Sequence, residues 1–488
     1  MQTDDKHDMS IKRNFIYNGT LTVSGYVFTL LTYPYVSRVL GLSNVGIVNF
    51  VDGLVNYFIL FAMMGVNTLG IREIAIVKSD REKLSRAFSS ILLLNGITVL
   101  VAIIVLLISM YTVPQLIPHR DLLYIGVCKL ISTLFLTEWF YTGTENFPYI
   151  TKRSIAIKFV YVICVFLFIR KPSDYYLYYL FCVLTVALNS VVNVIYSRKF
   201  VDFTFKGISI KPYLNTFFSV GFYIIVSSIY TSFSVVWLGM VAGTDQVGYY
   251  TTATKLHTII IALLTAFQNT MFPRVTSLLS EGKDSEYREK IRISVDSLLS
   301  FSIPAIIVAI IFGPNILHLL VGDGYEGAYL PFRIIVSLIF IIGYEQIICI
   351  QVLLAMKRER TLLKCSCFGA LAGLILNYIV VEHLGAVGSA MVWLSAELIV
   401  MVGAQYHVTR IICYSFPWRQ LMRYVLTYIP AIVLLMATYH YCSYSDIIVV
   451  TIASLFMAAY TLVVQIKIIK NPVCLQVINK TLSYAKQK

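Results

Sequence analysis

The chain has 488 residues, of which 58% are hydrophobic and only 13% are Asp, Glu, Lys or Arg. Soluble globular proteins carry about 25% charged residues, so this composition excludes an ordinary water-soluble domain. The formal net charge of +14 does not indicate a nucleic-acid partner, because the basic residues are scattered in short stretches between apolar runs and are not clustered on one arm.

Apolar stretches of membrane-spanning length recur from one end of the chain to the other. A helix needs roughly 20 apolar residues to cross the ~30 Å hydrocarbon core, and fourteen segments meet this length. Lipid offers no partner to an unpaired backbone amide, so each segment must be helical. We therefore predict an all-α membrane protein with fourteen transmembrane helices. The expected spans are residues 14–37, 46–68, 86–110, 121–141, 153–170, 175–197, 214–240, 247–271, 296–320, 330–355, 362–381, 385–409, 421–441 and 446–468.

The basic residues alternate between the connections in the way that the positive-inside rule predicts. Most of the 39 Lys and Arg residues fall in every second connection. This pattern places both termini on the cytoplasmic side. The polar stretch 274–292 lies on that side and is expected to form a separate surface helix. The outer connections contain Arg38, Arg120, Arg170 and Lys171.

An internal repeat relates the two halves of the chain by a shift of 202 residues. It aligns the loop after the first expected helix, the whole second helix and its inner end with the segment starting at residue 241. An even number of helices separates the copies, so both insert with the same orientation, as in transporters with a substrate site between two lobes. We expect an N-terminal lobe at 1–211, a C-terminal lobe at 212–412, and two peripheral helices with a cytoplasmic tail at 413–488. The identical positions are Val39, Gly41, Val45, Gly46, Leu54, Ile59, Asn67, Thr68 and Arg72, matched by Val241, Gly243, Val247, Gly248, Leu256, Ile261, Asn269, Thr270 and Arg274.

Two short motifs add a resemblance to a known family. The run from Pro34 to Gly46, PYVSRVLGLSNVG, resembles the first outer turn of bacterial polysaccharide flippases of the Wzx type. The run from Glu138 to Glu145, EWFYTGTE, is similar to the Trp-Phe-x-x-Gly-x-Glu element of the same family. These flippases form the polysaccharide transporter branch of the multidrug/oligosaccharidyl-lipid/polysaccharide exporter superfamily.

The resemblance implies a protein of the bacterial inner membrane that is not an enzyme. Its expected activity is to flip an oligosaccharide linked to undecaprenyl pyrophosphate, such as an O-antigen unit, from the cytoplasmic to the periplasmic leaflet. Alternating access through a central cavity would carry the sugar while the lipid tail stays among membrane lipids. A polysaccharide polymerase and chain-length proteins are the expected partners, and no cofactor is implied.

Four basic residues in or at the ends of helices are candidates for binding the anionic head group. Lys129 and Lys255 lie deep in the fourth and eighth expected helices, and Arg38 and Arg333 lie at outer helix ends. Ionisable residues inside a membrane usually face a cavity or a partner. A cationic lining is one interpretation, and snorkelling of long side chains to the lipid surface is the alternative.

Three acidic residues also lie deep in expected helices, namely Asp52, Glu345 and Glu397. They are candidates for coupling transport to protons or sodium, and structural ion pairing is the alternative. The nine cysteines and seven histidines show no metal-ligand spacing, so no metal is expected.

Two other functions remain as alternatives. An ion-coupled multidrug exporter of the same superfamily would need an acidic cavity for cationic drugs. A membrane polysaccharide polymerase or ligase would carry a large periplasmic loop with catalytic residues, and the connections here are short.

Overall fold

The computed structural model describes residues 2–204, 207–228, 232–441 and 445–471. Within these ranges every regular element is a helix and no strand occurs, which confirms the all-α prediction. The chain divides into two compact units, residues 1–248 and 249–488, and each is described by itself. Residues 472–488, in the predicted cytoplasmic tail, lie outside the described residues, and the division at residues 211 and 412 stays a prediction.

The first unit is a bundle in which α1 packs against α3, α4 and α6, and α4 packs against α7. A tenth helix, α10, begins at Thr244 in this unit and continues to Ser280 in the second. Short 3₁₀ turns at Pro114–His119 and Pro172–Asp174 lead into α4 and α7. The helices are α1 (Gln2–Met63), α2 (Val66–Val77), α3 (Arg81–Thr112), α4 (Arg120–Leu134), α5 (Glu138–Gly143), α6 (Phe147–Phe168), α7 (Tyr175–Ser197), α8 (Lys211–Ser228) and α9 (Phe233–Val241).

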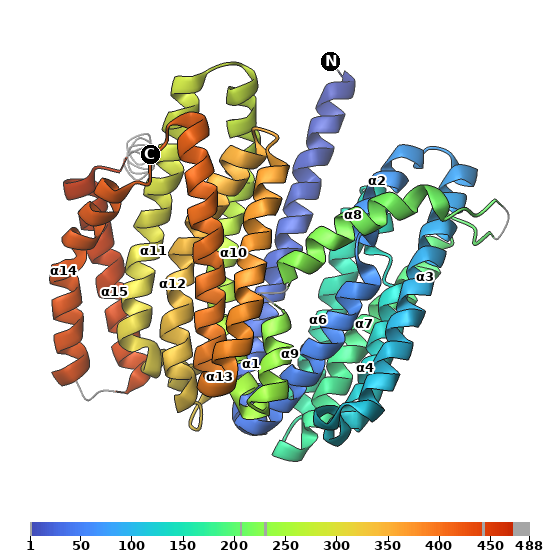
Figure 1. The fold of residues 1–488 in the computed structure, drawn as a ribbon, viewed down its shortest axis with the longest axis horizontal. Coiled ribbons are helices and arrows are strands. Elements are labelled where there is room, and N and C mark those ends of the chain that lie inside the picture. The colour runs from blue at the N-terminus through green and yellow to red at the C-terminus, as the bar shows by residue number, and fades with distance from the viewer. Residues whose placement is uncertain (1, 205–206, 229–231, 442–444, 472–488) are drawn as a thin grey trace, which may run out of the picture. The chain divides into compact units, whose positions relative to one another are not determined.

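In the second unit α12 lies between α11 and α13, while α14 and α15 pack against α11 at the margin of that unit (Figure 1). In the most apolar 18-residue stretch of α14 and in that of α15, 22% of the residues are buried, against 61% in the segment that contains α12. The helices are α11 (Asp284–Val321), α12 (Tyr329–Gln346) with a π-helical continuation at Ile347–Leu354, α13 (Glu359–Ile412), α14 (Trp418–Tyr441) and α15 (Asp446–Val463) with a π-helical continuation at Val464–Ile469.

Nine segments among the described residues are long and apolar enough to cross a membrane. Two of them bend sharply at a glycine, and each of these two continuous helices holds two of the spans expected from the sequence. Gly41 (φ 77°) divides α1 into two arms, and Gly385 (φ 54°) divides α13 into two arms. Both angles lie in the left-handed region, which glycine enters without a steric penalty. The structure thus supports a multi-pass membrane protein, and the count of fourteen spans stays a prediction.

Two expectations about helix boundaries are wrong. The stretch 274–292 does not form a separate surface helix, because α10 continues to Ser280 and α11 starts at Asp284. Only a short turn with Gly282 at φ 69° joins them. The expected helix at 121–141 stops at Leu134, and Thr137 adopts a left-handed conformation (φ 40°) before α5 begins.

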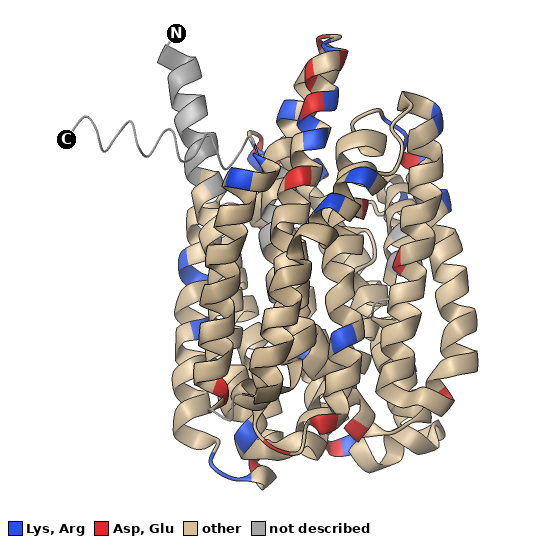
Figure 2. Cartoon of the chain, turned by 90° about the vertical axis from the view of Figure 1, so that its left-hand side faces the viewer, with Lys and Arg blue, Asp and Glu red and all other residues tan. Residues whose placement is uncertain are grey.

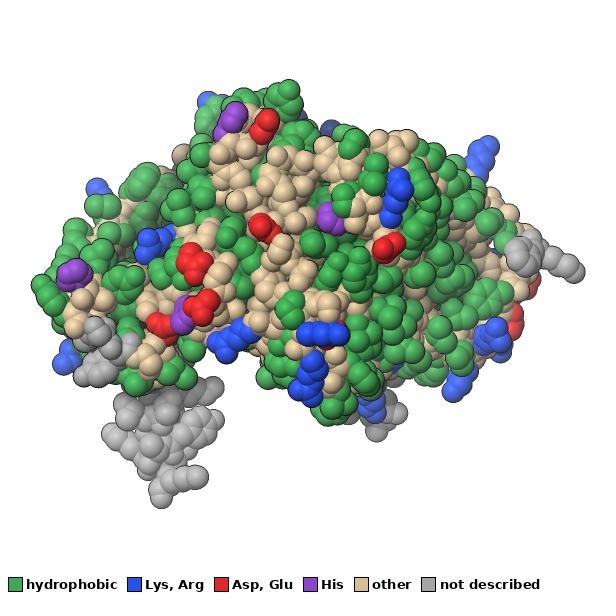
Figure 3. Space-filling view, turned by 90° about the horizontal axis from the view of Figure 1, so that it is seen from below, with side chains coloured by type: hydrophobic (Ala, Val, Ile, Leu, Met, Phe, Trp, Pro, Cys, Tyr) green, Lys and Arg blue, Asp and Glu red, His purple; other side chains and the backbone are tan. Residues whose placement is uncertain are grey.

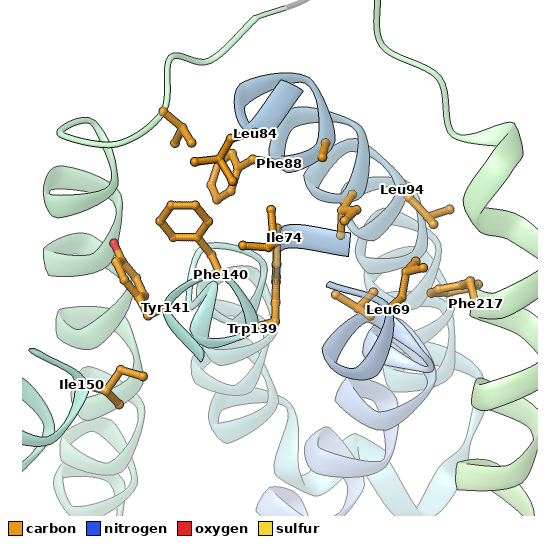
Figure 4. Packing of buried hydrophobic residues seen from close by; sticks show 14 residues of the cluster. Leu69, Ile74, Leu84, Phe88, Leu94, Trp139, Phe140, Tyr141, Ile150 and Phe217 are labelled. Atoms are coloured by element: carbon orange, nitrogen blue, oxygen red, sulfur yellow. The ribbon is translucent and has the colours of Figure 1, made fainter. Parts of the chain in front are cut away.

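A compact hydrophobic cluster holds α2, α3 and α5 together in the first unit. Trp139 and Phe140 of α5 are almost fully buried between Ile74 of α2 and Phe88 of α3 (Figure 4). Gly70 makes this packing possible, because a Cβ atom there would lie 2.5 Å from Cε3 of Trp139. Large aromatic side chains and a glycine therefore fix the position of α5.

The sequence repeat has a structural counterpart at the start of its two copies. Gly41 (φ 77°) and Gly243 (φ 90°) are aligned by the repeat and share a left-handed backbone conformation. A Cβ atom on Gly46 would lie 2.1 Å from the carbonyl oxygen of Thr244, and one on Gly248 would lie 2.7 Å from Leu42. Since the repeat aligns residue 42 with 244 and residue 46 with 248, the two contacts are equivalent. The two copies therefore touch through matching positions.

Charged residues gather toward the ends of the helices and are sparse along their middle parts (Figure 2). Seen from below, hydrophobic side chains dominate the surface and charged ones occur in small groups (Figure 3). In the connection before α3, the carboxylate of Asp80 accepts hydrogen bonds from the backbone amides of Glu82 and Lys83. The bond from Lys83 is the main reason that the pKa of Asp80 lies below its usual value. The gathering of charged residues at the helix ends is the distribution expected of helices embedded in lipid.

Candidate functional site

Lys129 forms a polar cluster with Asp52 and Asn56 inside the first unit. Lys129 projects from α4, while Asp52 and Asn56 lie one turn apart on the second arm of α1. The Nζ atom of Lys129 lies 2.6 Å from Oδ1 of Asp52 and 2.8 Å from Oδ1 of Asn56. The amide of Asn56 donates to the other carboxylate oxygen of Asp52 at 3.0 Å. The three side chains form a closed ring of hydrogen bonds between two packed helices.

This cluster pairs one cation with one anion, and in the part of the chain that the structure describes it leaves one donor of the lysine unused. The side chain of Lys129 is 12% exposed and that of Asp52 is 31% exposed. An ammonium group carries three N–H donors, and Asp52 and Asn56 are the only acceptors that Lys129 bonds among the described residues. The third donor thus has no protein acceptor among the described residues, while Asp52 offsets the charge of the lysine in a poorly hydrated setting.

Glu345 and Glu397 meet inside the second unit. Glu345 lies on α12 and Glu397 on the second arm of α13, and their carboxyl groups lie within hydrogen-bonding reach of one another. The residue Glu397 is only 7% exposed. Two carboxylates at such close range repel each other strongly unless they share a proton or a cation. The structure thus brings two of the three predicted acidic residues together.

Two aromatic side chains complete this second cluster. The indole Nε1 of Trp393 donates a hydrogen bond to Oε1 of Glu397 at 3.0 Å. The ring of His257, on α10, packs edge-on against Trp393 with the ring centroids 5.1 Å apart. His257 is 2% exposed, and neither of its ring nitrogens has a hydrogen-bond partner among the described residues. Three helices of the second unit thus bring a histidine, an indole and two carboxyl groups together.

The other predicted basic residues lie on the first arm of α1, on α10 and on α12. Arg38 is exposed near the end of the first arm of α1, three residues before Gly41. Arg333 is exposed on α12 and donates from Nε to the carbonyl oxygen of Ile310 at 3.0 Å. Lys255 is half-buried on α10, two residues before His257. Lys129 and Arg38 belong to the first unit and Lys255 and Arg333 to the second, so a lining shared by all four stays a prediction.

Comparison with known proteins identifies the family. The sequence profile described as "Polysaccharide biosynthesis protein" matches residues 11–279, which is more than half of the chain. The chain belongs to this family. A second profile, MatE, matches residues 220–379.

Relatives with known names match most of the length of the chain. A protein of Escherichia coli (strain K12) named O-antigen transporter is 25% identical over 401 residues, covering 80% of this chain and 95% of the relative. A protein of the same name from Shigella dysenteriae is 24% identical over 405 residues, covering 80% and 98%. The resemblance to Wzx-type polysaccharide flippases seen in the sequence is confirmed.

Solved structures share the fold at low sequence identity. The lipid II flippase MurJ in an inward closed conformation superposes with a TM-score of 0.73 and 15% identity, covering 91% of this chain and 98% of that one. A multidrug resistance MATE family transporter in an inward-facing conformation gives a TM-score of 0.62 and 13% identity, covering 79% and 95%. The chain therefore has the fold of MurJ and of MATE transporters.

The motif from Glu138 to Glu145 has a structural role in this family member. Glu138 accepts a hydrogen bond from Arg153 at 2.9 Å, and Glu145 pairs with Lys78 at 2.7 Å. Arg153 is 7% exposed and also donates to the side-chain oxygen of Asn193 on α7. The motif thus ties α5 to α2, α6 and α7.

Sequence reasoning did not single out three residues of these networks. Asn56 follows Asp52 by four residues, and Trp393 precedes Glu397 by four residues. Side chains at this spacing are neighbours on a helix, so both contacts were open to prediction. Arg153 gave no such signal, because basic residues at inner helix ends are expected of any membrane protein.

Proposed function

We propose that the protein flips a lipid-linked oligosaccharide, carried on undecaprenyl pyrophosphate, from the cytoplasmic to the periplasmic leaflet. The observation that carries this proposal is the family match over residues 11–279. Relatives named O-antigen transporter that align with 80% of the chain add support. The proposal includes fourteen spans, both termini in the cytoplasm, and a polymerase and chain-length proteins as partners. It assigns no catalytic reaction to the chain.

In this proposal Lys129 binds the anionic or hydroxyl-rich head group through its third N–H donor. Asp52 and Asn56 hold the ammonium group in place at 2.6 and 2.8 Å. A lysine without a partner would be costly at membrane depth, and a tightly bound pyrophosphate would leave slowly. The carboxylate of Asp52 offsets the positive charge that Lys129 presents to the ligand, so the ligand is held less tightly and its release is favoured. Lys255, Arg38 and Arg333 are proposed to extend the cationic path.

We also propose that Glu345 and Glu397 couple flipping to an ion gradient. Their carboxyl groups meet at a buried position, and the indole of Trp393 fixes one of them. Loss of a proton or cation from such a pair creates like charges that repel, so α12 and α13 would respond to occupancy.

Reconstituted vesicles provide the test of flipping. Purified protein is inserted into liposomes containing a fluorescent lipid-linked oligosaccharide, and a membrane-impermeant glycosidase outside reports which leaflet the sugar occupies. We expect protein-dependent exposure of the sugar that had been protected in the inner leaflet. Unchanged protection, in vesicles that contain folded protein, would contradict the proposal.

The coupling proposal is tested in the same vesicles with an imposed pH or sodium gradient. Glu345→Gln and Glu397→Gln each remove one ionisable carboxyl group while keeping its size, and we expect gradient-driven flipping to fall by about tenfold or more. Exchange without a gradient should continue. Glu382→Gln, at an exposed position on α13, is the matched control. An undiminished response to both gradients in the two variants would remove these residues from the coupling role.

A multidrug exporter is the second candidate, because the MatE profile matches residues 220–379. This function predicts that cells expressing the protein expel a cationic dye such as ethidium. Flipping without dye export would support the first candidate, and dye export without flipping the second. A polymerase or ligase, the remaining alternative, would lengthen or transfer the sugar in the same vesicles, and the product would change in mass.

A further inference from the structure

The two arms of α13 pack closely enough to form a narrow groove on the surface of the second unit. A Cβ atom on Gly369 would lie 2.5 Å from Cγ2 of Val400, and one on Gly403 would lie 3.2 Å from Sγ of Cys365. Glycine on each arm therefore allows the two backbones to approach. Cys365, which is 4% exposed, forms part of the floor.

The walls of the groove are apolar and open to the surroundings. Phe368 on the first arm and Val402 on the second arm are 66% and 61% exposed. Leu398, Ile399 and Tyr406 continue the lining, and the volume is about 560 Å³. Exposed apolar side chains on a membrane-spanning helix face hydrocarbon, so the groove is suited to a hydrocarbon chain.

One end of the groove is positively charged. Lys364 and His407 line this end, and the guanidinium group of Arg410 lies 4.3 Å from the centre of the Tyr406 ring. Lys364 has neither a hydrogen bond nor an ion pair among the described residues. Arg358 and Arg360 lie in the turn before it, with Glu359 between them. This end therefore has an excess of positive charge, on the side that the charge pattern assigns to the cytoplasm.

The length of the groove matches one leaflet of the bilayer. Nine residues separate Leu398 from His407, which is about 14 Å along a helix at ~1.5 Å per residue. One leaflet contributes about 15 Å of a hydrocarbon core that is ~30 Å thick. A single acyl chain whose phosphate lies at Lys364 would therefore fill the groove and end near the bilayer midplane. A longer polyprenyl chain would run past it.

We propose that this groove binds an anionic glycerophospholipid of the cytoplasmic leaflet. One acyl chain lies along Phe368, Leu398 and Val402, and the phosphate is held by Lys364 and Arg410. Anionic lipids are abundant in that leaflet and are attracted to basic positions at the membrane surface. The lipid packs across both arms of α13 and so stabilises their contact. This site is separate from the head-group site around Lys129 and does not depend on the flipping function.

The test compares phosphatidylglycerol with phosphatidylcholine of identical acyl chains. Full-length protein in detergent is titrated with each lipid, and binding is read by native mass spectrometry and by the melting temperature. We expect phosphatidylglycerol to bind more tightly and to raise the melting temperature more. Lys364→Ala should weaken phosphatidylglycerol binding about tenfold, the loss of one charge-assisted hydrogen bond. Lys152→Ala, an exposed lysine of the first unit, is the control.

A second variant tests the hydrocarbon part of the site without changing its charge. Val402→Trp should block the groove and weaken the binding of phosphatidylglycerol, while Ile375→Trp, at another exposed apolar position, should not. Equal binding of the two lipids would overturn the proposal. Full binding of phosphatidylglycerol by both Lys364→Ala and Val402→Trp would also overturn it. A third contrary result would be undecaprenyl phosphate that stays bound to the protein when phosphatidylglycerol is added in excess.

Discussion

At the scale of single residues, the protein keeps its membrane-embedded charges in small groups. The ammonium group of Lys129 pairs with the carboxylate of Asp52 and donates a hydrogen bond to Asn56. The carboxyl groups of Glu345 and Glu397 lie next to one another. The first group joins a cation to an anion, and the second brings two carboxyl groups together. The sequence was sufficient to name the four ionisable residues but not Asn56, because ionisable side chains stand out in apolar segments. It was not sufficient to pair Glu345 with Glu397, since 52 positions separate them and helix rotation is set by packing.

The lysine cluster allows a charge effect to be separated from a structural one. Lys129→Ala should abolish most flipping and also lower stability, because Asp52 loses its ionic partner. The stability loss should be below the ~3–5 kcal/mol of a fully buried broken pair, since Asp52 keeps 31% of its side chain exposed. The double variant Lys129→Met with Asp52→Asn should regain stability but not transport. Melting temperature and vesicle flipping measure the two effects.

The control for this prediction is the exposed pair of Lys78 and Glu145, whose side chains are 46% and 47% exposed. Surface ion pairs contribute about 0–1 kcal/mol, so Lys78→Ala should change neither stability nor flipping. If the double variant flips as well as the unaltered protein, Lys129 serves only to neutralise Asp52.

At the scale of elements, glycine and aromatic residues decide where helices bend and meet. Hydropathy located the apolar segments because lipid permits only helices there. It did not predict that α1 and α13 continue through kinks at Gly41 and Gly385, because a left-handed glycine ends some helices and only bends others. Hydropathy also did not predict that α10 and α11 extend into the polar stretch 274–292, because a hydropathy profile does not distinguish polar residues in a helix from polar residues in a loop.

The packing of α5 on α2 gives a prediction at this scale. Gly70→Ala should lower the stability of the first unit by about 1–3 kcal/mol through overpacking, because the new Cβ atom would lie 2.5 Å from the ring of Trp139. Gly19→Ala is the matched control, since no atom lies within 4 Å of its Cβ position. Alanine stabilises an open helical site by up to about 1 kcal/mol. Thermal unfolding followed by Trp fluorescence distinguishes the two variants, and equal melting temperatures would contradict the prediction.

At the scale of the whole molecule, the distribution of basic residues predicts the orientation in the membrane. Green fluorescent protein joined after Gly282 should fluoresce, because that turn is expected in the cytoplasm. Alkaline phosphatase joined after Asp323 should be active, because the connection between α11 and α12 is expected in the periplasm. The reverse pattern would invert the proposed direction of transport. The fold class and the family were predictable from the sequence because they depend on hydropathy, spacing and motifs distributed along the chain.

The contacts of Gly46 and Gly248 restrict which residues the two copies of the repeat can carry at these positions. Gly46 faces Thr244, and its counterpart Gly248 faces Leu42, which the repeat aligns with Thr244. A Cβ atom on Gly46 would lie only 2.1 Å from the carbonyl oxygen of Thr244. A side chain at residue 46 would meet the backbone of Thr244, and one at residue 248 would meet Leu42. A library randomised at the codons for residues 46 and 248 and selected for surface polysaccharide should therefore return glycine at both positions. The repeat then stays recognisable there.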